Sequence, residues 1–376
     1  MVKKITVLHL VGSLEDAGGI LSVIRQLQAA TESLGCKHRV LVHHRFVEQR
    51  RPALDYRYSR FICSEMASSA SMFWRACLAT LETRSLLAHE HFDLVHAHSR
   101  CGFLMAVGLA TWMQRTVLFT NHDYAKRKGM YRAAARRSRF HTVLLTPNMA
   151  KHYGLVEQPP KVNIISACCG DQFFAEPLPA FSGQPRRENG RVRLVGVGSM
   201  VRWKKWHLLF DALLALDDET RAKLEVSIHG PIVQTEPDSL AYEREIRERH
   251  RDERLQQCVS LPGPSNSVAE LLRIADWFVL PSTNEPCSVA LMEALALGVP
   301  ALVSASGGSI DIVTENGSGL FFEPDNANDL AQKLRMIASA HHAPWPAERI
   351  RESVRHRSAS AVGAQYLALY RSLLDR

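Results

Sequence analysis

The stretch "LPSTNEPCSVALMEALALGVP", residues 280–300, carries two carboxylates, Glu285 and Glu293, eight positions apart with no other acidic residue between them. In one continuous helix the two would be rotated by about 80° and separated by about 12 Å, too far for a catalytic pair. The preceding letters "DWFVLPS" instead predict a β-strand, which places Glu285 in the loop beyond its carboxyl end. A helix then begins near Ser288, which can act as its N-cap, and ends at Gly298.

This strand–loop–helix unit predicts an anion site. The first helical amides, with the helix dipole, suit a phosphate, and they belong to Cys287, Ser288 and Val289. Glu293 lies about one and a half turns into the helix, so both carboxylates can point into one cleft from different depths. Carboxylates would repel a phosphate that they touched, but they can bind hydroxyl groups on either side of it. That is the shape of a nucleotide-sugar.

The rest of the chain alternates short β-branched runs with longer amphipathic segments, which indicates an α/β protein with doubly wound parallel sheets. The alternation stops in "EPLPAFSGQPRRENGR", residues 176–191, and restarts after it. We therefore expect a domain over residues 1–175, a linker over 176–191, a second domain over 192–355 and a terminal helix over 356–376. That helix caps one domain or crosses back to the first. Ligands of open α/β sheets bind beyond the carboxyl ends of the strands, so a cleft between two such domains is expected.

Bulk properties narrow the class of protein. The chain has 376 residues and a net charge of +8, which favours anionic partners without choosing among them. The first residues lack a signal-peptide cleavage site, and no apolar run is long enough to cross a membrane. The eight cysteines show no CxxC pair and no zinc-type spacing, so we expect reduced thiols and a cytoplasmic protein.

A diphosphate also needs cations, and the segment "VGSMVRWKKWHLLFDAL" supplies them after another strand. Arg202, Lys204 and Lys205 fall in the loop that opens the next helix. A basic loop is more often a solvated surface. Its position at a strand end, in the same domain as the two carboxylates, favours a binding role here.

Together with "EPCSVALMEALALGVPALVSASGG", this segment resembles the retaining GT-B glycosyltransferases of the GT4 type. Their hallmark is a Glu-x7-Glu after a strand, with a lysine in an earlier glycine–strand loop. The resemblance covers nearly the whole chain, because "HLVGSLEDAGGI", "DLVHAH" and "FVLPSTNEP" follow in the order that the family shows. It implies a GT-B fold, with two Rossmann-like parallel-sheet domains facing each other across a cleft.

The resemblance also implies roles for single residues. Lys204 would hold the donor diphosphate, Glu293 the ribose hydroxyls and Glu285 the hydroxyls of the transferred sugar. In the N-terminal domain, His98 would sit beside the reacting sugar. Gly18 and Gly19 would let the backbone approach the diphosphate or the acceptor.

The sequence departs from the family pattern at several positions. Ser199 stands where an arginine is frequent, so Arg202 or Lys205 would supply that charge. Lys205 itself replaces a usual glycine, and Cys287–Ser288 replaces a Phe-Gly type of turn. The segment "CCGDQFF" replaces the usual Asn-Gly-Val-Asp turn before the linker. None of these changes removes the lysine or either glutamate.

Metal-dependent transferases hold Mg²⁺ or Mn²⁺ on an Asp-x-Asp pair, and no two aspartates in this chain are two positions apart. We therefore expect no metal and no cofactor, with cations and helix amides stabilising the leaving group. The histidines of "HEHFDLVHAH" could bind a metal, but a solvated turn and a polar contact of His98 with substrate are favoured.

Acceptor-side candidates follow other strands and a basic run. Asn121 and His122 end the segment "TNHDY", and loop hydrogen bonding is an equal alternative for them. Lys126 and Arg127 open the basic run of residues 125–140. That run fits either a peripheral contact with the inner face of a membrane or a solvated helix face. Nucleic acid is disfavoured, because the run shows no regular interleaving of aromatic with basic residues and no binding motif.

The expected function is transfer of a sugar from a nucleotide-sugar to a saccharide or glycolipid acceptor, in surface polysaccharide or lipopolysaccharide assembly. A nucleotide-sugar epimerase on the same fold and a non-catalytic nucleotide-sugar-binding protein are the alternatives. A phosphorylase would need a longer chain, and "VGSLEDAGG" lacks the G-x-G-x-x-G pattern of a dehydrogenase. The donor base is expected near "HGPIVQ" and "PGPSNSV"; the sequence specifies neither base, sugar nor acceptor.

Overall fold

The computed structural model describes residues 4–16, 18–48, 53–64, 67–178, 190–233, 237–265, 267–340 and 345–375. The chain forms two compact units: the first contains Met1–Cys168 and Ala359–Arg376, and the second contains Cys169–Ser358. Most of the expected linker, residues 179–189, lies outside the described residues. Each unit is treated by itself below.

The N-terminal unit is built on a parallel sheet of seven strands in the order β3-β2-β1-β4-β5-β6-β7. The strands are β1 (Ile5–Leu10), β2 (Cys36–His43), β3 (Asp55–Ser59), β4 (Leu94–Ala97), β5 (Val117–Asn121), β6 (Phe140–Leu144) and β7 (Val162–Ile164). The strand order reverses between β1 and β4, which pair with His9 opposite His96. This is the switch point at which ligands bind in doubly wound sheets.

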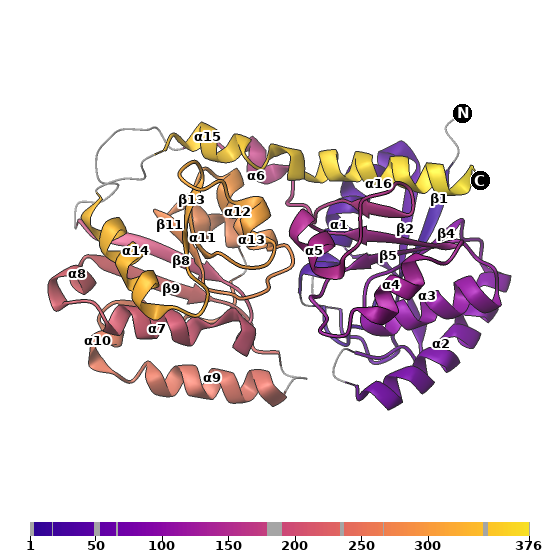
Figure 1. Ribbon diagram of the computed structural model, residues 1–376, viewed down its shortest axis with the longest axis horizontal. Helices are drawn as coiled ribbons and strands as arrows, with labels where there is room; N and C mark the ends of the chain where they lie inside the picture. Colours follow the sequence, from indigo (N-terminus) through magenta and orange to yellow (C-terminus); the bar gives the residue numbers. More distant parts are fainter. Residues whose placement is uncertain are drawn as a thin grey trace. The chain divides into compact units, whose positions relative to one another are not determined.

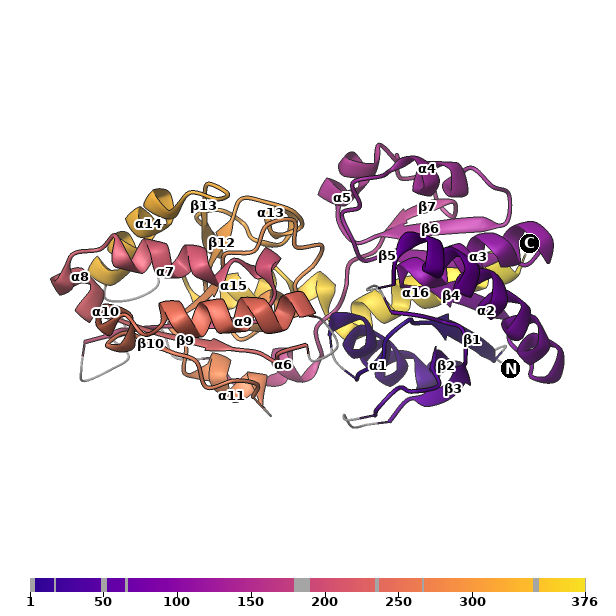
Figure 2. The same cartoon turned by 90° about the horizontal axis from the view of Figure 1, so that it is seen from below.

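Helices cover both faces of this sheet (Figures 1 and 2). They are α1 (Gly19–Thr31), η1 (Glu32–Leu34), α2 (Ser69–His89), α3 (Arg100–Trp112), α4 (Gly129–Ala135), α5 (Pro147–Tyr153) and α16 (Ala359–Leu374). Helix α16 packs along α1, and α2 packs along α3 (Figure 1). The last helix of the chain thus completes the N-terminal unit, where Tyr366 and Tyr370 are fully buried.

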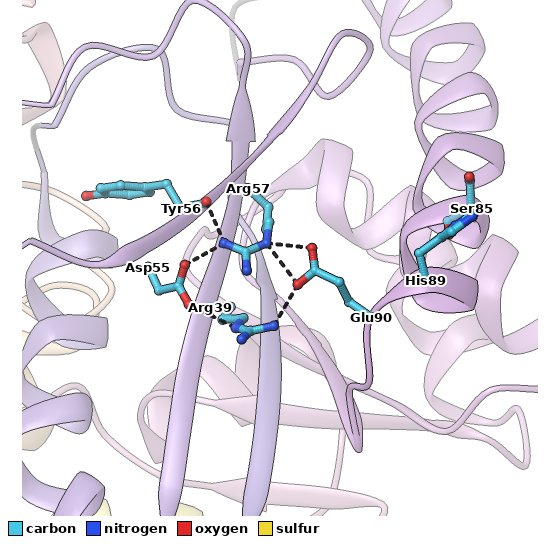
Figure 3. A network of polar contacts seen from close by, with 7 residues as sticks. All are labelled: Arg39, Asp55, Tyr56, Arg57, Ser85, His89 and Glu90. Atoms are coloured by element: carbon cyan, nitrogen blue, oxygen red, sulfur yellow. Dashed lines mark hydrogen bonds and ion pairs between the residues drawn. The ribbon is translucent and has the colours of Figure 1, made fainter.

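The strand β3 was not predicted, because its sequence "DYRYS" is charged and short. It is an edge strand, and its charges pair with neighbours rather than facing a core (Figure 3). Arg39 on β2 donates to Asp55 at 2.9 Å and to Glu90 at 2.6 Å. Arg57 donates to Asp55 at 2.5 Å and to Glu90 at 2.8 Å. Charges on an edge strand also discourage pairing with a second molecule.

The C-terminal unit has a parallel sheet of six strands in the order β10-β9-β8-β11-β12-β13. They are β8 (Val192–Val197), β9 (Leu224–His229), β10 (Val259–Ser260), β11 (Trp277–Leu280), β12 (Ala301–Ser304) and β13 (Gly319–Phe322). Five of these six strands contain β-branched residues, as the alternating pattern predicts, whereas β13, "GLFF", contains none. The order reverses between β8 and β11, so the two strands that precede the basic loop and the first carboxylate are direct neighbours.

The helices of this unit again lie on both faces of the sheet, with α7 and α9 on one face and α11 and α12 on the other (Figure 1). They are α6 (Gln172–Ala175), η2 (Arg202–Lys204), α7 (Trp206–Leu214), α8 (Asp218–Ala222), α9 (Pro237–Arg249), α10 (Glu253–Gln256), α11 (Val268–Arg273), α12 (Val289–Ala296), α13 (Ser309–Ile312), α14 (Ala327–Ser339), α15 (Ala347–Glu352) and η3 (Arg355–Arg357). The predicted α/β class with two parallel sheets is confirmed. Among the described residues, no helix is both long and apolar enough to cross a bilayer.

Candidate active site

A buried ion pair lies at the carboxyl edge of the C-terminal sheet. The Nζ of Lys204 lies 2.5 Å from Oε2 of Glu285, and the two side chains are only 10% and 8% exposed. Each comes from the loop after one of the two central strands, β8 and β11. The loops are also joined by their backbones, since Thr283 N–H donates to Trp203 C=O at 3.2 Å. The lysine further lies over the Trp203 ring, 4.5 Å from its centroid.

Glycines allow the chain to approach both members of this pair. A Cβ on Gly198, just after β8, would lie 3.0 Å from Cε and 3.3 Å from Nζ of Lys204. A Cβ on Gly307 would lie 2.6 Å from the carbonyl oxygen of Glu285, and Gly307 also has a left-handed φ of +60°. The next residue, Gly308, donates its N–H to that carbonyl at 2.7 Å. Both glycines therefore help to position the ion pair, a role that their spacing alone did not reveal.

The other two cations of the basic loop have different partners. Arg202 donates to Glu245 at 2.7 Å and lies over the Tyr242 ring, so it points toward α9. Its hydrogen bond to Glu245 raises the pKa of its guanidinium. Lys205 has a left-handed φ of +55° and pairs with Asp325, while burial lowers its pKa. Of the three predicted cations, the structure thus brings only Lys204 to Glu285.

The helix after Glu285 begins as predicted. Ser288 is the N-cap of α12 and accepts a hydrogen bond from Leu291 N–H at 3.3 Å. Cys287 and Ser288 are buried, and Val289 is the first helical residue. Glu293 lies one turn into α12 and is half-buried. The helix ends at Ala296, two residues before the expected Gly298, which follows the C-cap with a φ of +74°.

A cavity of about 400 Å³ opens beyond the ends of β8, β9 and β10. Its walls are mainly apolar and include Met200, Gly230, Pro231, Ile232, Leu261 and Pro262. The two segments expected to surround the donor base, "HGPIVQ" and "PGPSNSV", supply much of this lining. Ser199, at the end of β8, is half-buried, and its carbonyl accepts from the indole of Trp206 at 3.4 Å.

Three buried serines were missed by sequence reasoning. Ser282, Ser304 and Ser309 lie at the ends of β11 and β12 and at the start of α13, and each is at most 1% exposed. Among the described residues, none of their hydroxyl groups has a hydrogen-bond partner. Serine is so common after strands that no pattern could have singled them out.

The predicted residues of the N-terminal unit fall into two groups. Gly18, with a φ of +89°, caps α1, which Gly19 begins; both are exposed with open space where a Cβ would stand. Lys126 and Arg127 are also exposed. These four residues can all meet a ligand that approaches from solvent.

The strand-end residues of this unit lie deeper. Asn121 is 2% exposed, and its side-chain oxygen accepts from Asp123 N–H at 3.1 Å. This is the loop hydrogen bond that was the alternative to an acceptor contact. His98 is 3% exposed, and both of its ring nitrogens have partners, His9 at 2.8 Å and His122 at 3.1 Å. Burial lowers the pKa of His98 well below its usual value and that of His122 to about 4. These imidazoles are therefore neutral at pH 7.

The side chains of His9, His96 and His98 are close enough together to hold a metal ion. His9 was not considered from the sequence, because it lies almost ninety positions before the other two.

Comparison with known proteins points to the same unit of the chain as the site geometry does. Residues 180–355 match the family model of the glycosyl transferases group 1. The C-terminal unit is a group 1 glycosyltransferase domain. The predicted glycosyltransferase family is thereby confirmed for residues 180–355, somewhat less than half of the chain; the narrower GT4 type stays a prediction.

The chain is 34% identical over 177 residues to an Escherichia coli (strain K12) protein named as a colanic acid biosynthesis glycosyltransferase, WcaL. The match covers 44% of this chain and 41% of that protein, so the chain spans well under half the length of this relative.

Solved structures are similar over nearly the whole chain. Sucrose-phosphate synthase from Thermosynechococcus elongatus has a TM-score of 0.80 at 18% identity, with 99% of this chain and all of that chain covered. Anabaena HepE, solved with UDP-glucose, has a TM-score of 0.74 at 14% identity, covering 98% and 99% of the two chains. At this level of identity the likeness concerns the fold, and it confirms the predicted two-domain GT-B class.

Proposed function

We propose that the protein transfers a sugar from a nucleotide-sugar to a saccharide or glycolipid acceptor, with retention of configuration and without a metal or cofactor. The observation that carries the proposal is the buried pair of Lys204 and Glu285 at the carboxyl ends of adjacent strands. A buried ion pair adds little to stability and is often replaceable by apolar residues. Its position beside the start of α12, where a phosphate can bind, instead supports a role in ligand binding.

In this proposal the donor diphosphate lies at the N-terminus of α12, near the amides of Cys287, Ser288 and Val289. The ammonium of Lys204 neutralises the charge that develops on the leaving group, and the helix amides add to it. Such groups do not reorganise during the reaction, so they can take the place of a metal ion. Arg202, Lys205 and Ser199 line the approach at the end of β8.

The two carboxylates bind hydroxyl groups in this proposal. Glu285 accepts from hydroxyls of the transferred sugar, and its contact with Lys204 holds its carboxylate in place. Glu293 accepts from the ribose hydroxyls, and the cavity of about 400 Å³ accommodates the base. The acceptor then attacks from the face that the diphosphate leaves, with the departing phosphate taking the proton.

Thermal unfolding with a panel of nucleotide-sugars in EDTA tests this assignment. Ligand that binds only the native state at 100 times its Kd stabilises it by about 2.7 kcal/mol. We expect one of UDP-, GDP-, ADP- or CMP-sugars to raise the Tm of the wild type. That donor should not raise the Tm of Glu293→Ala, whereas Glu323→Ala, an exposed glutamate of the same unit, should respond like the wild type.

The two alternatives give other outcomes. Donor conversion without any acceptor would favour an epimerase. Binding without turnover across broad acceptor screens would favour a binding protein. No stabilisation by any donor, or stabilisation that survives Glu293→Ala, would contradict the proposed site.

We further propose that the protein acts in the cytoplasm at the inner face of a membrane, in surface polysaccharide assembly. An exposed apolar face on α2 supports this proposal: Phe73 and Trp74 are 52% and 68% exposed. Trp112 on α3 is 62% exposed and shares a groove of about 200 Å³ with Phe73 and Arg137. Arg137 of the basic run 125–140 therefore flanks apolar side chains that can enter a lipid headgroup layer.

Co-sedimentation with phosphatidylcholine vesicles, with and without phosphatidylglycerol, tests the membrane contact. We expect binding only to the anionic vesicles, weakened by Trp74→Ser and by Arg137→Glu. Met336→Ser, which removes an equally exposed side chain from the C-terminal unit, should bind like the wild type. Equal binding by all four proteins would contradict this surface.

A further inference from the structure

Four neutral histidines form a row across the N-terminal sheet. His38 lies on β2, His9 on β1, His98 directly after β4 and His122 directly after β5, and these four strands are consecutive in the sheet. His9, His38 and His98 are at most 3% exposed, and His122 is half-buried. The row thus runs from the interior of the unit to its surface.

Each ring in the row is hydrogen-bonded to the next. His38 Nδ1 lies 2.8 Å from His9 Nε2, His9 Nδ1 lies 2.8 Å from His98 Nε2, and His98 Nδ1 lies 3.1 Å from His122 Nε2. At the inner end, His38 Nε2 lies 2.8 Å from the hydroxyl of Thr31. A neutral imidazole has one N–H donor and one acceptor nitrogen, so the direction of any one bond determines all the others.

Thr31 sets that direction. Its hydroxyl donates to the carbonyl of Leu27 at 2.7 Å, so toward His38 it can only accept. Nε2 of His38 therefore carries the proton, and Nδ1 of His38 accepts from His9. The same reasoning applies along the row. Nε2–H of His98 donates to Nδ1 of His9, and Nε2–H of His122 donates to Nδ1 of His98. All four rings are Nε2–H tautomers, and the row ends at Nδ1 of His122 as an unprotonated acceptor.

A metal ion is a poorer explanation of the cluster. Two imidazole nitrogens on a tetrahedral zinc lie about 3.3 Å apart, given bonds of about 2.0–2.1 Å. His9 and His98 instead meet at 2.8 Å, a hydrogen-bond distance. Both nitrogens of His96 are also engaged, with Tyr370 at 2.9 Å and Thr120 at 2.7 Å.

We propose that this row holds His122 with Nδ1 as a hydrogen-bond acceptor for a hydroxyl group of a sugar substrate, and that Thr31, His38, His9 and His98 are positioning residues that act through it. Among the described residues, Nδ1 of His122 has no hydrogen-bond partner. The inner end stops at a backbone carbonyl and at the thiol of Cys36, whose pKa burial raises to about 11, so neither group takes up a proton at pH 7. The row therefore orients His122 rather than conducting protons to solvent. The substrate contact rests on the proposed glycosyl transfer, whereas the row itself does not.

The loop that carries His122 is held in place by Tyr153. The hydroxyl of Tyr153 donates to Asp123 C=O at 2.7 Å and accepts from Ala125 N–H at 2.8 Å. Asn121 and Asp123 are joined across His122 by the side-chain bond described above. Both the position and the tautomer of His122 are thus determined by its surroundings.

Two-bond ¹H–¹⁵N spectra of histidine-labelled protein at pH 7 test the row without any ligand, because they distinguish the two neutral tautomers. In the wild type we expect Nε2–H at all four rings, with the signals of His122 assigned through their loss in His122→Gln. Thr31→Val removes the hydroxyl that sets the direction, so at least half of His122 should switch to the Nδ1–H tautomer. Thr31→Ser keeps the hydroxyl and should restore the wild-type spectrum.

A matched control is Thr83→Val on α2. Thr83 is equally buried and makes the same bond to the carbonyl four residues earlier, at 2.7 Å. Among the described residues its hydroxyl has no hydrogen bond to a histidine. Its spectrum should match the wild type. An Nδ1–H tautomer at His98 or His122 in the wild type, or an unchanged spectrum in Thr31→Val, would overturn the row. So would one equivalent of bound zinc that is lost in His9→Gln.

Nucleotide release from the donor that stabilises the protein tests the contact with substrate. Loss of the Nδ1 acceptor in half of the molecules predicts a kcat/KM about twofold lower in Thr31→Val, rising to about tenfold if the switch is complete, with Thr31→Ser and Thr83→Val close to the wild type. A switched tautomer with unchanged kcat/KM would overturn the contact. If no donor in the panel binds, the proposed function fails, while the spectra still decide the row.

Discussion

The two units bury different polar groups at the carboxyl edges of their sheets, although the N-terminal unit also buries one ion pair, Arg25 with Asp16 at 2.6 Å. The C-terminal unit buries a full positive and a full negative charge, Lys204 and Glu285, in direct contact. The N-terminal unit buries imidazoles that burial keeps neutral, with the pKa of His38 lowered to about 4. A charge pair can neutralise a diphosphate, and a neutral row can only orient hydrogen bonds. The comparison is consistent with the proposal that Lys204 and Glu285 meet the diphosphate and that the histidine row orients a hydroxyl group.

The largest effect is expected from breaking the ion pair. Lys204→Ala leaves the Glu285 carboxylate buried without its cation, which should lower the free energy of unfolding by about 3–5 kcal/mol. The double variant Lys204→Met/Glu285→Leu removes both charges, and its free energy of unfolding should lie within about 1 kcal/mol of that of the wild type. Urea denaturation of the three proteins measures the difference. Equal losses in the single and double variants would show that the charges are not coupled.

An intermediate effect is expected from acidification. A histidine whose pKa is lowered by folding is protonated first in the unfolded chain. The free energy of unfolding therefore falls as the pH drops below about 6.5 and continues to fall until the folded pKa of about 4 is reached. Each such histidine contributes up to about 1.4 kcal/mol per pH unit within this window.

The N-terminal unit should therefore unfold first in acid. Urea denaturation between pH 7 and pH 5 measures how steeply the free energy of unfolding changes with pH. In His38→Phe this slope should be smaller than in the wild type, by up to the contribution of one histidine. His89→Phe, which removes an exposed histidine from α2 of the same unit, should leave the slope unchanged. A slope that His38→Phe does not alter would contradict the neutral, buried assignment.

The smallest effect is expected at the edge strand β3. Hydrogen bonding with Arg57 lowers the pKa of Glu90, so its contribution is present above the unfolded pKa and is lost as the pH falls through the folded pKa. The two side chains are 26% and 29% exposed, and ion pairs at the protein surface contribute about 0–1 kcal/mol. Glu90→Gln should lower the free energy of unfolding by no more than this at pH 7, measured in urea. A loss of several kcal/mol would mean that the network in Figure 3 holds the sheet together.

The sequence predicted the parallel sheets and the cap at Ser288, because strand runs and capping residues are local patterns. It also predicted that Lys204 and Glu285 belong to one site, since residues after adjacent strands meet at one edge. It did not predict the contact between them, which depends on the close approach that Gly198 and Gly307 permit. The row from His38 to His122 was missed because neighbouring strands are far apart in the sequence. Strand β3 was missed because its sequence, "DYRYS", is short and charged and so lacks the apolar run that predicts a strand.

The most direct test of the central claim is nucleotide release in EDTA from the stabilising donor, with a purified acceptor glycan, by the wild type and by Lys204→Met/Glu285→Leu. Both proteins are expected to be folded, so stability does not confound the comparison. The account predicts metal-free release by the wild type and a rate at least about 10²-fold lower in the double variant. Equal rates in the two folded proteins would contradict the claim that this buried ion pair performs the transfer.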